Sequence, residues 1–302
     1  MMDIVRPLIG VVGFIFFAVN IVIFIIPIIL LSMVKLVLPF AWARKFISAA
    51  LNWFATAWIG VNSFLAHFHV DIKVSWPENL KLSRRDWYLV MANHQSWVDI
   101  YILQNIFNRK IPFLKFFLKR ELIFVPLLGI AWWALDFPFM KRHSKEYLKK
   151  HPEKKGQDLE TTKRACEKFQ HIPISVMNFV EGTRFTAAKS ARQNSPFPHL
   201  LKPKSGGVGT VLSILGEKMQ NVLDVTIYYP QGIPTFWDFL SGRIEQVQVV
   251  VRQFAVKPEI IGDMTNADTR IRVQSWLNQI WQEKEQTIAR LSEQQKVSNS
   301  AS

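Results

Sequence analysis

Residues 8–34 carry no charged side chain, and this long apolar run constrains the fold of the chain more than any other feature. As a continuous α-helix the run would extend about 40 Å, which exceeds the roughly 30 Å hydrocarbon core of a bilayer. Only Asn20 and Pro27 fit poorly in lipid. A secretory signal peptide has a shorter apolar core and a more basic start than Arg6 provides. The sequence therefore predicts a tilted transmembrane helix near the N-terminus.

A second uncharged segment, residues 46–66, follows a short basic stretch. Its Ser48, Asn52, Thr56 and Gly60 recur every four positions and form a weakly polar stripe along one helix face. The segment either returns through the bilayer or lies in its interface, with its aromatic side chains at headgroup depth. Both alternatives remain open from the sequence.

The net charge of +14 predicts an anionic partner. The densest basic stretch, residues 141–155, contains seven Lys or Arg. Because this charge accompanies a membrane-length helix, anionic lipid headgroups or a phosphorylated substrate explain it better than nucleic acid. Lys35, Arg44 and Lys45 separate the two apolar segments and place the bulk of the chain on the cytoplasmic side. The single cysteine, Cys166, excludes a disulfide framework and is consistent with a reducing compartment.

Beyond residue 70, short β-rich runs alternate with helical patterns, which predicts an α/β layered domain with a largely parallel sheet, preceded by N-terminal membrane helices. We expect membrane-anchoring helices over 1–70, the α/β domain over 71–291 and a disordered polar tail over 292–302. The apolar segment 122–140 contains Asp136, so we favour a buried or membrane-facing part of the domain over a further span. Predicted strands are 70–74, 87–92, 174–180, 222–229 and 246–256, and predicted helices are 98–108, 158–170, 207–219 and one that starts near 266–268.

The strongest chemical signal is residues 93–99 (Asn-His-Gln-Ser-Trp-Val-Asp), directly after the predicted strand 87–92. A carboxylate that fixes one tautomer of a histidine makes the other ring nitrogen a proton acceptor. His94 and Asp99 therefore form a candidate general-base pair. No His, Cys and carboxylate cluster in the sequence predicts a metal site.

Four blocks along the chain resemble the PlsC-like glycerophospholipid acyltransferases, a family that includes lysophosphatidic acid and lysocardiolipin acyltransferases. The first block is 93–99, the second is 118–129 with 137–142, the third is 179–184 (Phe-Val-Glu-Gly-Thr-Arg), and the fourth is 201–207 with 221–230. The chain is also similar to bacterial inner-membrane acyltransferases, which implies an inner-membrane location with the catalytic domain in the cytoplasm.

The resemblance implies transfer of a fatty acyl group from acyl-CoA or acyl-carrier protein to the free hydroxyl of a lysophospholipid, with no further cofactor. His94 would be the general base, and Asp99 would orient its ring and stabilise the imidazolium. Arg184 suits a phosphate of the acceptor. The remaining substrate-binding candidates are Glu181, Gly182, Thr183, Arg142 and Lys204.

The chain departs from the family pattern at three places. Val180 replaces the usual proline, Lys141 stands where an aspartate commonly precedes the arginine, and the fourth block lacks the usual valine-proline pair. These differences affect acceptor recognition more than the chemistry. A hydrolase that transfers the acyl group to water, and a non-catalytic protein that binds anionic lipid, remain as alternatives.

Overall fold

The computed structural model describes residues 2–67, 70–126, 128–137, 139–140, 173–219 and 221–301. Its centre is a six-stranded sheet with the strand order β1-β8-β7-β2-β6-β3, in which only the β7–β8 pair is antiparallel. The strands are β1 Asp71–Ser75, β2 Tyr88–Ala92, β3 Leu114–Phe116, β6 Ser175–Phe179, β7 Asn221–Tyr228 and β8 Gln246–Ala255, and a separate parallel pair joins β4 Leu118–Lys119 to β5 Phe139–Met140.

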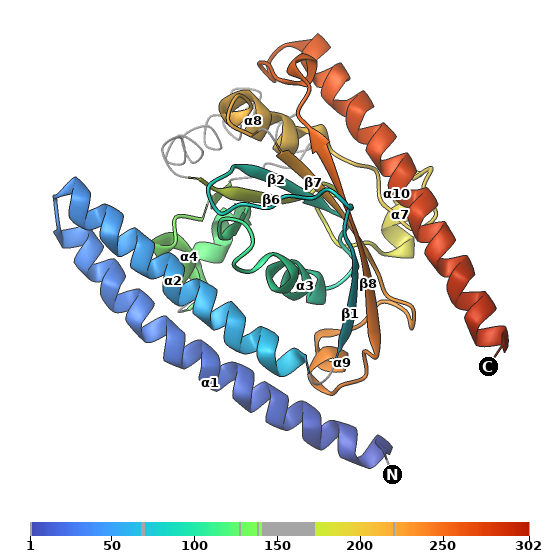
Figure 1. Cartoon of the computed structure of the whole chain (residues 1–302), viewed down its shortest axis with the longest axis horizontal. Coiled ribbons are helices and arrows are strands. Elements are labelled where there is room, and N and C mark those ends of the chain that lie inside the picture. The colour runs from blue at the N-terminus through green and yellow to red at the C-terminus, as the bar shows by residue number, and fades with distance from the viewer. Residues whose placement is uncertain are drawn as a thin grey trace.

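Helices cover both faces of the sheet (Figure 1). On one face lie α3 and, outside it, the hairpin of α1 and α2; on the other lie α8 and α10 (Figure 1). The helices are α1 Met2–Val37, α2 Ala41–Ala66, α3 Val98–Phe107, α4 Leu128–Ala134, α7 Ala187–Gln193, α8 Ser205–Leu215, α9 Phe236–Leu240 and α10 Ala267–Ala301, with 3-10 turns η1 Arg120–Phe124 and η3 Pro258–Ile260.

The central strand β2 explains why the sequence there is apolar without alternation. All five of its residues are buried. Tyr88, Val90 and Ala92 contact the core beneath α3, whereas Leu89 and Met91 contact the core beneath α8 and α10. A parallel strand that is covered on both faces needs apolar side chains at every position. Polar side chains that could form a site therefore appear only after β2 ends.

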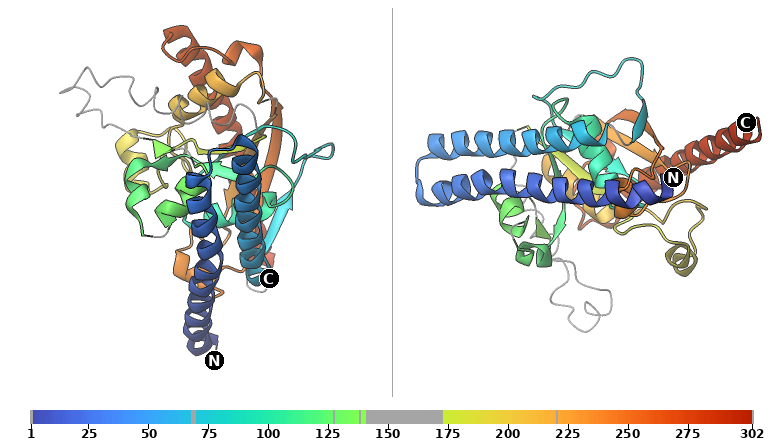
Figure 2. Two further views of the ribbon diagram at one scale, coloured as in Figure 1. Left: turned by 90° about the vertical axis from the view of Figure 1, so that its left-hand side faces the viewer. Right: turned by 90° about the horizontal axis from the view of Figure 1, so that it is seen from below.

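The two N-terminal helices form an antiparallel hairpin along the domain, as Figure 2 also shows from two further directions. Asn20, a polar residue in the apolar run, is buried and donates a 2.7 Å hydrogen bond to Oδ1 of Asn62 on α2. Lys35 forms a 2.7 Å ion pair with Asp136 just after α4. Thus the polar residues of α1 connect it to the rest of the chain, while most of its apolar surface remains exposed.

The α/β prediction with a largely parallel sheet is confirmed. All five predicted strands lie within one residue of their observed bounds, and the predicted helices 98–108 and 207–219 correspond to α3 and α8. Segment 122–140 forms η1, α4 and β5, so its described residues contain no continuous helix of membrane length. The predicted helix 158–170, the basic stretch 141–155 and Cys166 lie outside the described residues.

The expected disordered tail is wrong for residues 292–301, because α10 continues to Ala301. Residues 292–301 contain no Gly or Pro that would end a helix, and most of them are Glu, Gln, Lys, Ser or Ala, which tolerate it. Polarity alone suggested disorder, but an uninterrupted polar sequence can extend a helix whose earlier turns are anchored to the sheet.

Candidate active site

The candidate site lies at the carboxyl ends of β2, β6 and β7, where three segments distant in sequence meet. Asn93 follows β2 and joins it to β7 through two 2.9 Å hydrogen bonds with the backbone of Ile227, one given by its Nδ2 and one accepted by its Oδ1. These bonds extend the sheet ladder by one side chain. They also fix the chain direction at the residue before His94.

His94 and Asp99 are brought together as the sequence predicts. The Nδ1 atom of His94 lies 2.9 Å from Oδ2 of Asp99. The imidazole stacks on the ring of Phe179, at the end of β6, with centroids 3.8 Å apart and planes 13° apart. The side chain of His94 is 13% exposed, and that of Asp99 is fully buried. A carboxylate on Nδ1 leaves Nε2 as the proton-accepting nitrogen.

Asp99 is held by three donors besides the histidine. Its Oδ2 also accepts the backbone N–H groups of Gln95 and Ser96, at 2.6 and 2.8 Å. Its Oδ1 accepts the hydroxyl of Tyr229 at 2.6 Å. Burial, followed by the charge and hydrogen bond of Asp99, raises the pKa of Tyr229 well above its usual value, so this phenol remains a donor. The carboxylate is thus fixed in position and in orientation.

Glu181 lies beneath the same loop and is fully buried. Its Oε1 accepts the backbone N–H of His94, and its Oε2 accepts that of Leu201, both at 3.2 Å. Burial raises the pKa of Glu181 to about 8, although these two hydrogen bonds oppose the shift. The side chain therefore connects the His94 loop to the segment before α8 and does not face the opening of the site.

The Gly182–Arg184 turn places a cation beside the histidine loop. Gly182 adopts φ 72°, a left-handed conformation that glycine tolerates best. Arg184 is exposed, and its guanidinium lies 5.0 Å from the centre of the Trp97 ring. The Trp97 side chain is 55% exposed. Lys189 on α7 donates to the hydroxyl of Thr183 and to the carbonyl of Arg184, both at 2.9 Å.

Two further predicted residues have different outcomes. The backbone N–H of Lys204 bonds to the carbonyl of Val180, which places the start of α8 next to the third block. Arg142 lies outside the described residues. Within the described ranges, no three His, Cys, Asp or Glu side chains lie together in an arrangement that could hold a metal ion.

Sequence reasoning missed two functional groups of this site, Tyr229 and Lys189. Tyr229 was visible as the last residue of the predicted strand 222–229 and directly follows β7, and the carboxyl ends of neighbouring parallel strands meet at one edge. Lys189 carried no comparable signal, because its proximity to Thr183 depends on how the turn before α7 closes.

A buried acid, an oriented imidazole and a nearby exposed arginine form the chemistry expected of transfer to a hydroxyl group. In agreement with this geometry, a family model described as "Acyltransferase" matches residues 71–229, more than half of the chain. The chain belongs to the acyltransferase family. The matched region contains β1, the first three blocks and β7, and thus every residue of the described site.

Curated relatives in the acyltransferase family are similar over about two thirds of the chain. The mouse protein "1-acyl-sn-glycerol-3-phosphate acyltransferase gamma" (Mus musculus) is 26% identical over 67% of the chain and 52% of its own length. "Lysocardiolipin acyltransferase 1" from chicken (Gallus gallus) is 26% identical over 68% of the chain and 54% of its own length. The chain thus spans about half the length of these relatives.

Among solved structures, the crystal structure of "1-acyl-sn-glycerophosphate (LPA) acyltransferase, PlsC" from Thermotoga maritima aligns over 98% of both chains. The TM-score is 0.49 and the sequence identity is 18%. The resemblance to PlsC-like glycerophospholipid acyltransferases inferred from the four blocks is confirmed at the level of the family.

Proposed function

We propose that this protein transfers a fatty acyl group from an acyl thioester, acyl-CoA or acyl-carrier protein, to the free hydroxyl of lysophosphatidic acid or a related lysophospholipid. The observation that carries the proposal is the 2.9 Å contact of His94 Nδ1 with a carboxylate held by three other donors. Such an acid cannot turn away from the imidazole, so Nε2 is the proton acceptor throughout the reaction.

In this reaction the hydroxyl oxygen of the acceptor attacks the carbonyl carbon of the thioester while Nε2 of His94 takes the hydroxyl proton. The imidazolium is stabilised by Asp99 at 2.9 Å. The carbon–sulfur bond then breaks, and the leaving thiolate takes the proton from the imidazolium and is released as a thiol. The acceptor supplies the nucleophile, so neither an acyl-enzyme nor a metal or prosthetic group is required, and the donor is a co-substrate.

We assign recognition of the acceptor phosphate to Arg184, with Lys189 beside it. The two cations share the Thr183–Arg184 turn, and a guanidinium offers two parallel donors to a phosphate. Gly182 lets this turn approach a ligand closely. Arg142 and Lys204 remain candidates for further phosphate or donor contacts, and Glu181 supports the site from below.

An apolar cavity near this edge of the sheet suits the acyl chain. It has a volume of about 390 Å³ and lies between α1, α3 and α9. Tyr101, two residues beyond Asp99 on α3, and Phe239 on α9 contribute to its wall opposite α1. Its remaining lining is Leu8, Ile9, Val12, Gly13, Phe16, Phe17, Asn62 and Leu240. We propose that a membrane-derived acyl chain enters along α1 and reaches the site from this cavity.

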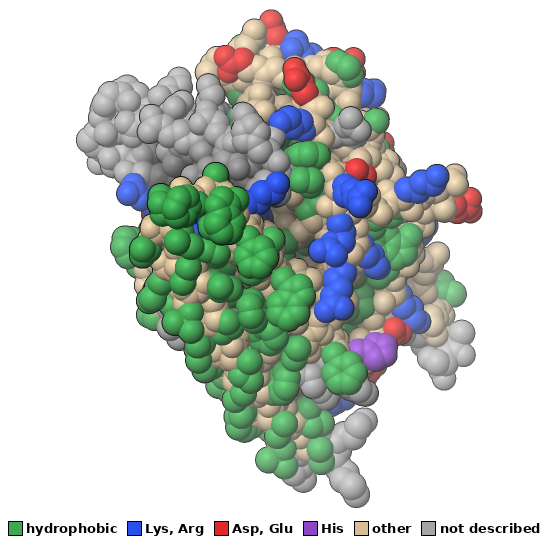
Figure 3. Space-filling model, turned by 60° about the vertical axis from the view of Figure 1, so that its left-hand side comes forward, with side chains coloured by type: hydrophobic (Ala, Val, Ile, Leu, Met, Phe, Trp, Pro, Cys, Tyr) green, Lys and Arg blue, Asp and Glu red, His purple; other side chains and the backbone are tan. Residues whose placement is uncertain are grey.

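We propose that residues 1–70 anchor the protein to the inner membrane with the domain over 71–291 on its cytoplasmic side. In the described part of the chain, α1 is the one helix long and apolar enough to cross a membrane, by length and composition. Figure 3 shows hydrophobic side chains covering the outer face of the helix hairpin. Contacts of α1 with α4 and α9 hold the hairpin against the domain, so substrates from the membrane have a short path to the site.

The His94→Ala variant tests the catalytic assignment in detergent-solubilised full-length protein. Acyl transfer should fall by about 10²–10⁴-fold, because the general base is lost. His199→Ala is a matched control, since His199 also pairs with a carboxylate, Glu285 at 2.5 Å, but on the α10 side of the domain. The assay measures the acylated lipid and the free fatty acid separately. Normal turnover by His94→Ala would refute the assignment, and free fatty acid formed at the same rate without acceptor would identify a hydrolase.

The phosphate role of Arg184 is tested by comparing a phosphate-bearing acceptor with a neutral monoacylglycerol. Arg184→Ala should lower kcat/KM for the phosphate-bearing acceptor by a factor that corresponds to about 1.5–3 kcal/mol of transition-state stabilisation. The value of kcat/KM for the neutral acceptor should change much less. Arg192→Ala, an exposed arginine at the end of α7, is the control. Equal losses for both acceptors would rule out a contact with the phosphate.

A further inference from the structure

A second cavity, which has polar and charged residues in its wall, lies at the edge of the sheet opposite to His94. Its volume is about 600 Å³, and it is bounded by α2, the end of α3 and the segments that lead into β2, β3 and β6. His94 follows the carboxyl end of β2, whereas Arg84 and Pro173 of the cavity precede the amino ends of β2 and β6. The five residues of β2 separate the two edges by roughly 17 Å. The cavity is therefore distinct from the candidate active site.

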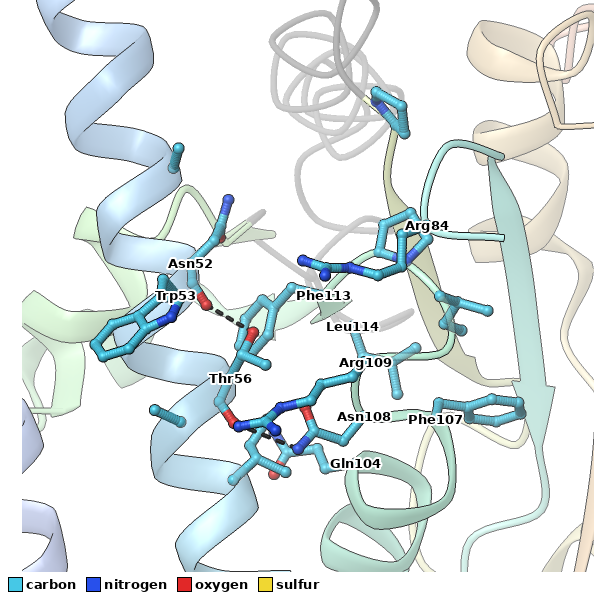
Figure 4. Close-up of a pocket in the computed structure, with 16 residues that line it drawn as sticks. Asn52, Trp53, Thr56, Arg84, Gln104, Phe107, Asn108, Arg109, Phe113 and Leu114 are labelled. Atoms are coloured by element: carbon cyan, nitrogen blue, oxygen red, sulfur yellow. Dashed lines mark hydrogen bonds between the residues drawn. The ribbon is translucent and has the colours of Figure 1, made fainter. Parts of the chain in front are cut away.

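Two arginines converge on this cavity from different segments (Figure 4). Arg84 extends from the loop before β2 toward α2, and Arg109 from the end of α3 lies next to Thr56 (Figure 4). A terminal nitrogen of Arg109 would be 3.5 Å from a Cβ built on Gly60, so the guanidinium rests against α2 where a side chain is absent. Neither arginine forms an ion pair with another described residue. Two guanidinium groups that no described carboxylate neutralises, side by side at one cavity, favour an anion.

The backbone of Arg109 supports a specific role. The residue adopts φ 63° directly after the C-cap of α3, at a position where helices usually carry Gly or Asn. A left-handed arginine costs free energy, and the cost is retained here at a residue that points to the cavity. Asn108 secures the turn by donating a hydrogen bond from Nδ2 to the carbonyl of Thr56 at 3.3 Å.

The weakly polar stripe of α2 faces this cavity. Asn52 and Thr56 line it, and Gly60 contacts Arg109. The hydroxyl of Thr56 is turned to the carbonyl of Asn52 at 2.7 Å, and the Asn52 side chain lies on the cavity side of α2 (Figure 4). The stripe thus contributes amide and backbone groups opposite the two arginines.

The rim of the cavity belongs to the apolar face of the hairpin. Trp53 lines the cavity and is 64% exposed, and Trp42 and Phe46 extend the same helix surface at 75% and 74% exposure. Figure 3 shows Lys and Arg side chains gathered directly beside the hydrophobic face of the hairpin. Exposed tryptophans next to cations are typical of a surface at the headgroup level of a membrane.

We propose that this cavity binds the phosphate headgroup of an anionic membrane glycerophospholipid, with the acyl chains of the lipid along the exposed face of α2. Arg84 and Arg109 contact the phosphate, the amide of Asn52 contacts the glycerol region, and Trp53 covers the headgroup from the membrane side. A bound acyl donor does not fit this position, because the fully buried strand β2 and its neighbours block a direct path through the domain to His94. The site holds lipid without transforming it, independently of the proposed acyl transfer.

The test measures binding of dihexanoyl-phosphatidylglycerol to the detergent-solubilised full-length protein by thermophoresis. The Arg84→Gln/Arg109→Gln variant should bind this lipid at least about ten-fold more weakly than the wild type. Lys81→Gln/Arg85→Gln is the matched control, because it removes two exposed positive charges from the same loop without altering the lining of the cavity. Both arginines of the test variant are exposed, so folding is preserved, and thermal unfolding without added lipid verifies this.

Further arms of the experiment distinguish the source of the phosphate. Dihexanoyl-phosphatidylcholine should bind more weakly than dihexanoyl-phosphatidylglycerol, and inorganic phosphate should bind more weakly than either lipid, because it lacks contacts with α2. An equal loss of affinity in the control variant would overturn the proposal, because the binding would then depend on general surface charge and not on this cavity. Equally tight binding of inorganic phosphate, or displacement of the lipid by CoA, would overturn the proposal in favour of a free phosphate site or a donor site.

Discussion

The hydroxyl of Tyr229 offers the most direct test of the geometry around His94. Tyr229→Phe removes one oxygen atom and keeps the aromatic ring, which is 4% exposed. The lost bond is the 2.6 Å contact with Oδ1 of Asp99. The other three contacts of this carboxylate all go to Oδ2. The variant therefore leaves Oδ1 of a fully buried carboxylate without the donor that Tyr229 supplies.

The expected cost is that of removing a hydrogen bond to a buried charged group, about 1.5–3 kcal/mol. For a domain of this size the loss corresponds to a decrease of roughly 3–8 °C in the thermal midpoint. Asp99 also loses one of the bonds that fix its orientation toward His94, so kcat/KM for acyl transfer should fall.

Tyr228→Phe is the matched control, because Tyr228 is the last residue of β7, directly before Tyr229, and contacts the opposite core, beneath α8 and α10. Thermal unfolding followed by circular dichroism and kcat/KM for acyl transfer are measured for both variants. If Tyr229→Phe behaves like Tyr228→Phe in both measurements, the hydroxyl does not support Asp99 and the proposed orientation of the acid is wrong.

Three other predictions concern stability. Burial raises the pKa of Glu181 to about 8, so its contribution to stability is full below about pH 4.5 and is lost as the pH rises toward 8. Glu181→Gln should therefore reduce the decrease of the thermal midpoint between these pH values. An unchanged dependence of the midpoint on pH would contradict the burial of Glu181. Lys284→Met removes a fully buried cation 2.9 Å from Asp224 and should lower the free energy of unfolding by about 3–5 kcal/mol, measured by chemical denaturation. Lys284→Met combined with Asp224→Asn should lower it by less than the sum of the two single variants. Additive losses would exclude a direct pair. Gly207→Ala places a Cβ 2.4 Å from Nδ2 of Asn178 on β6 and should lower the thermal midpoint. The Cβ of Gly206→Ala meets no atom within 4 Å, so this control should leave the midpoint unchanged or raise it. Equal midpoints would contradict the packing of α8 on the sheet.

The extent to which this fold could be predicted depended on how local each signal is. The strand 87–92 is apolar at every position because both faces of β2 are covered, and this pattern is readable without a structure. The tail over 292–301 shows the opposite case. Its polar composition resembles that of a disordered segment, but its helical state follows from continuity with the anchored part of α10.

The candidate site divides in the same way. His94 and Asp99 are five residues apart, and one turn after a strand is enough to bring them together, so the sequence alone predicted the pair. The bonds of Tyr229 to Asp99 and of Asn93 to Ile227 join residues more than 100 positions apart in the chain. No local pattern encodes such contacts, because they depend on which strands become neighbours in the sheet.

The sequence by itself determined the apolar N-terminal helix, the alternating α/β pattern and the histidine–aspartate pair, since each depends on residue spacing within one segment. Only the tertiary structure decided that Asp136 is neutralised by Lys35, that Glu181 supports the loop of His94 from below and that the stripe of α2 faces Arg84 and Arg109. The physical reason is that a charge becomes buried, paired or available to a ligand only when distant segments enclose it.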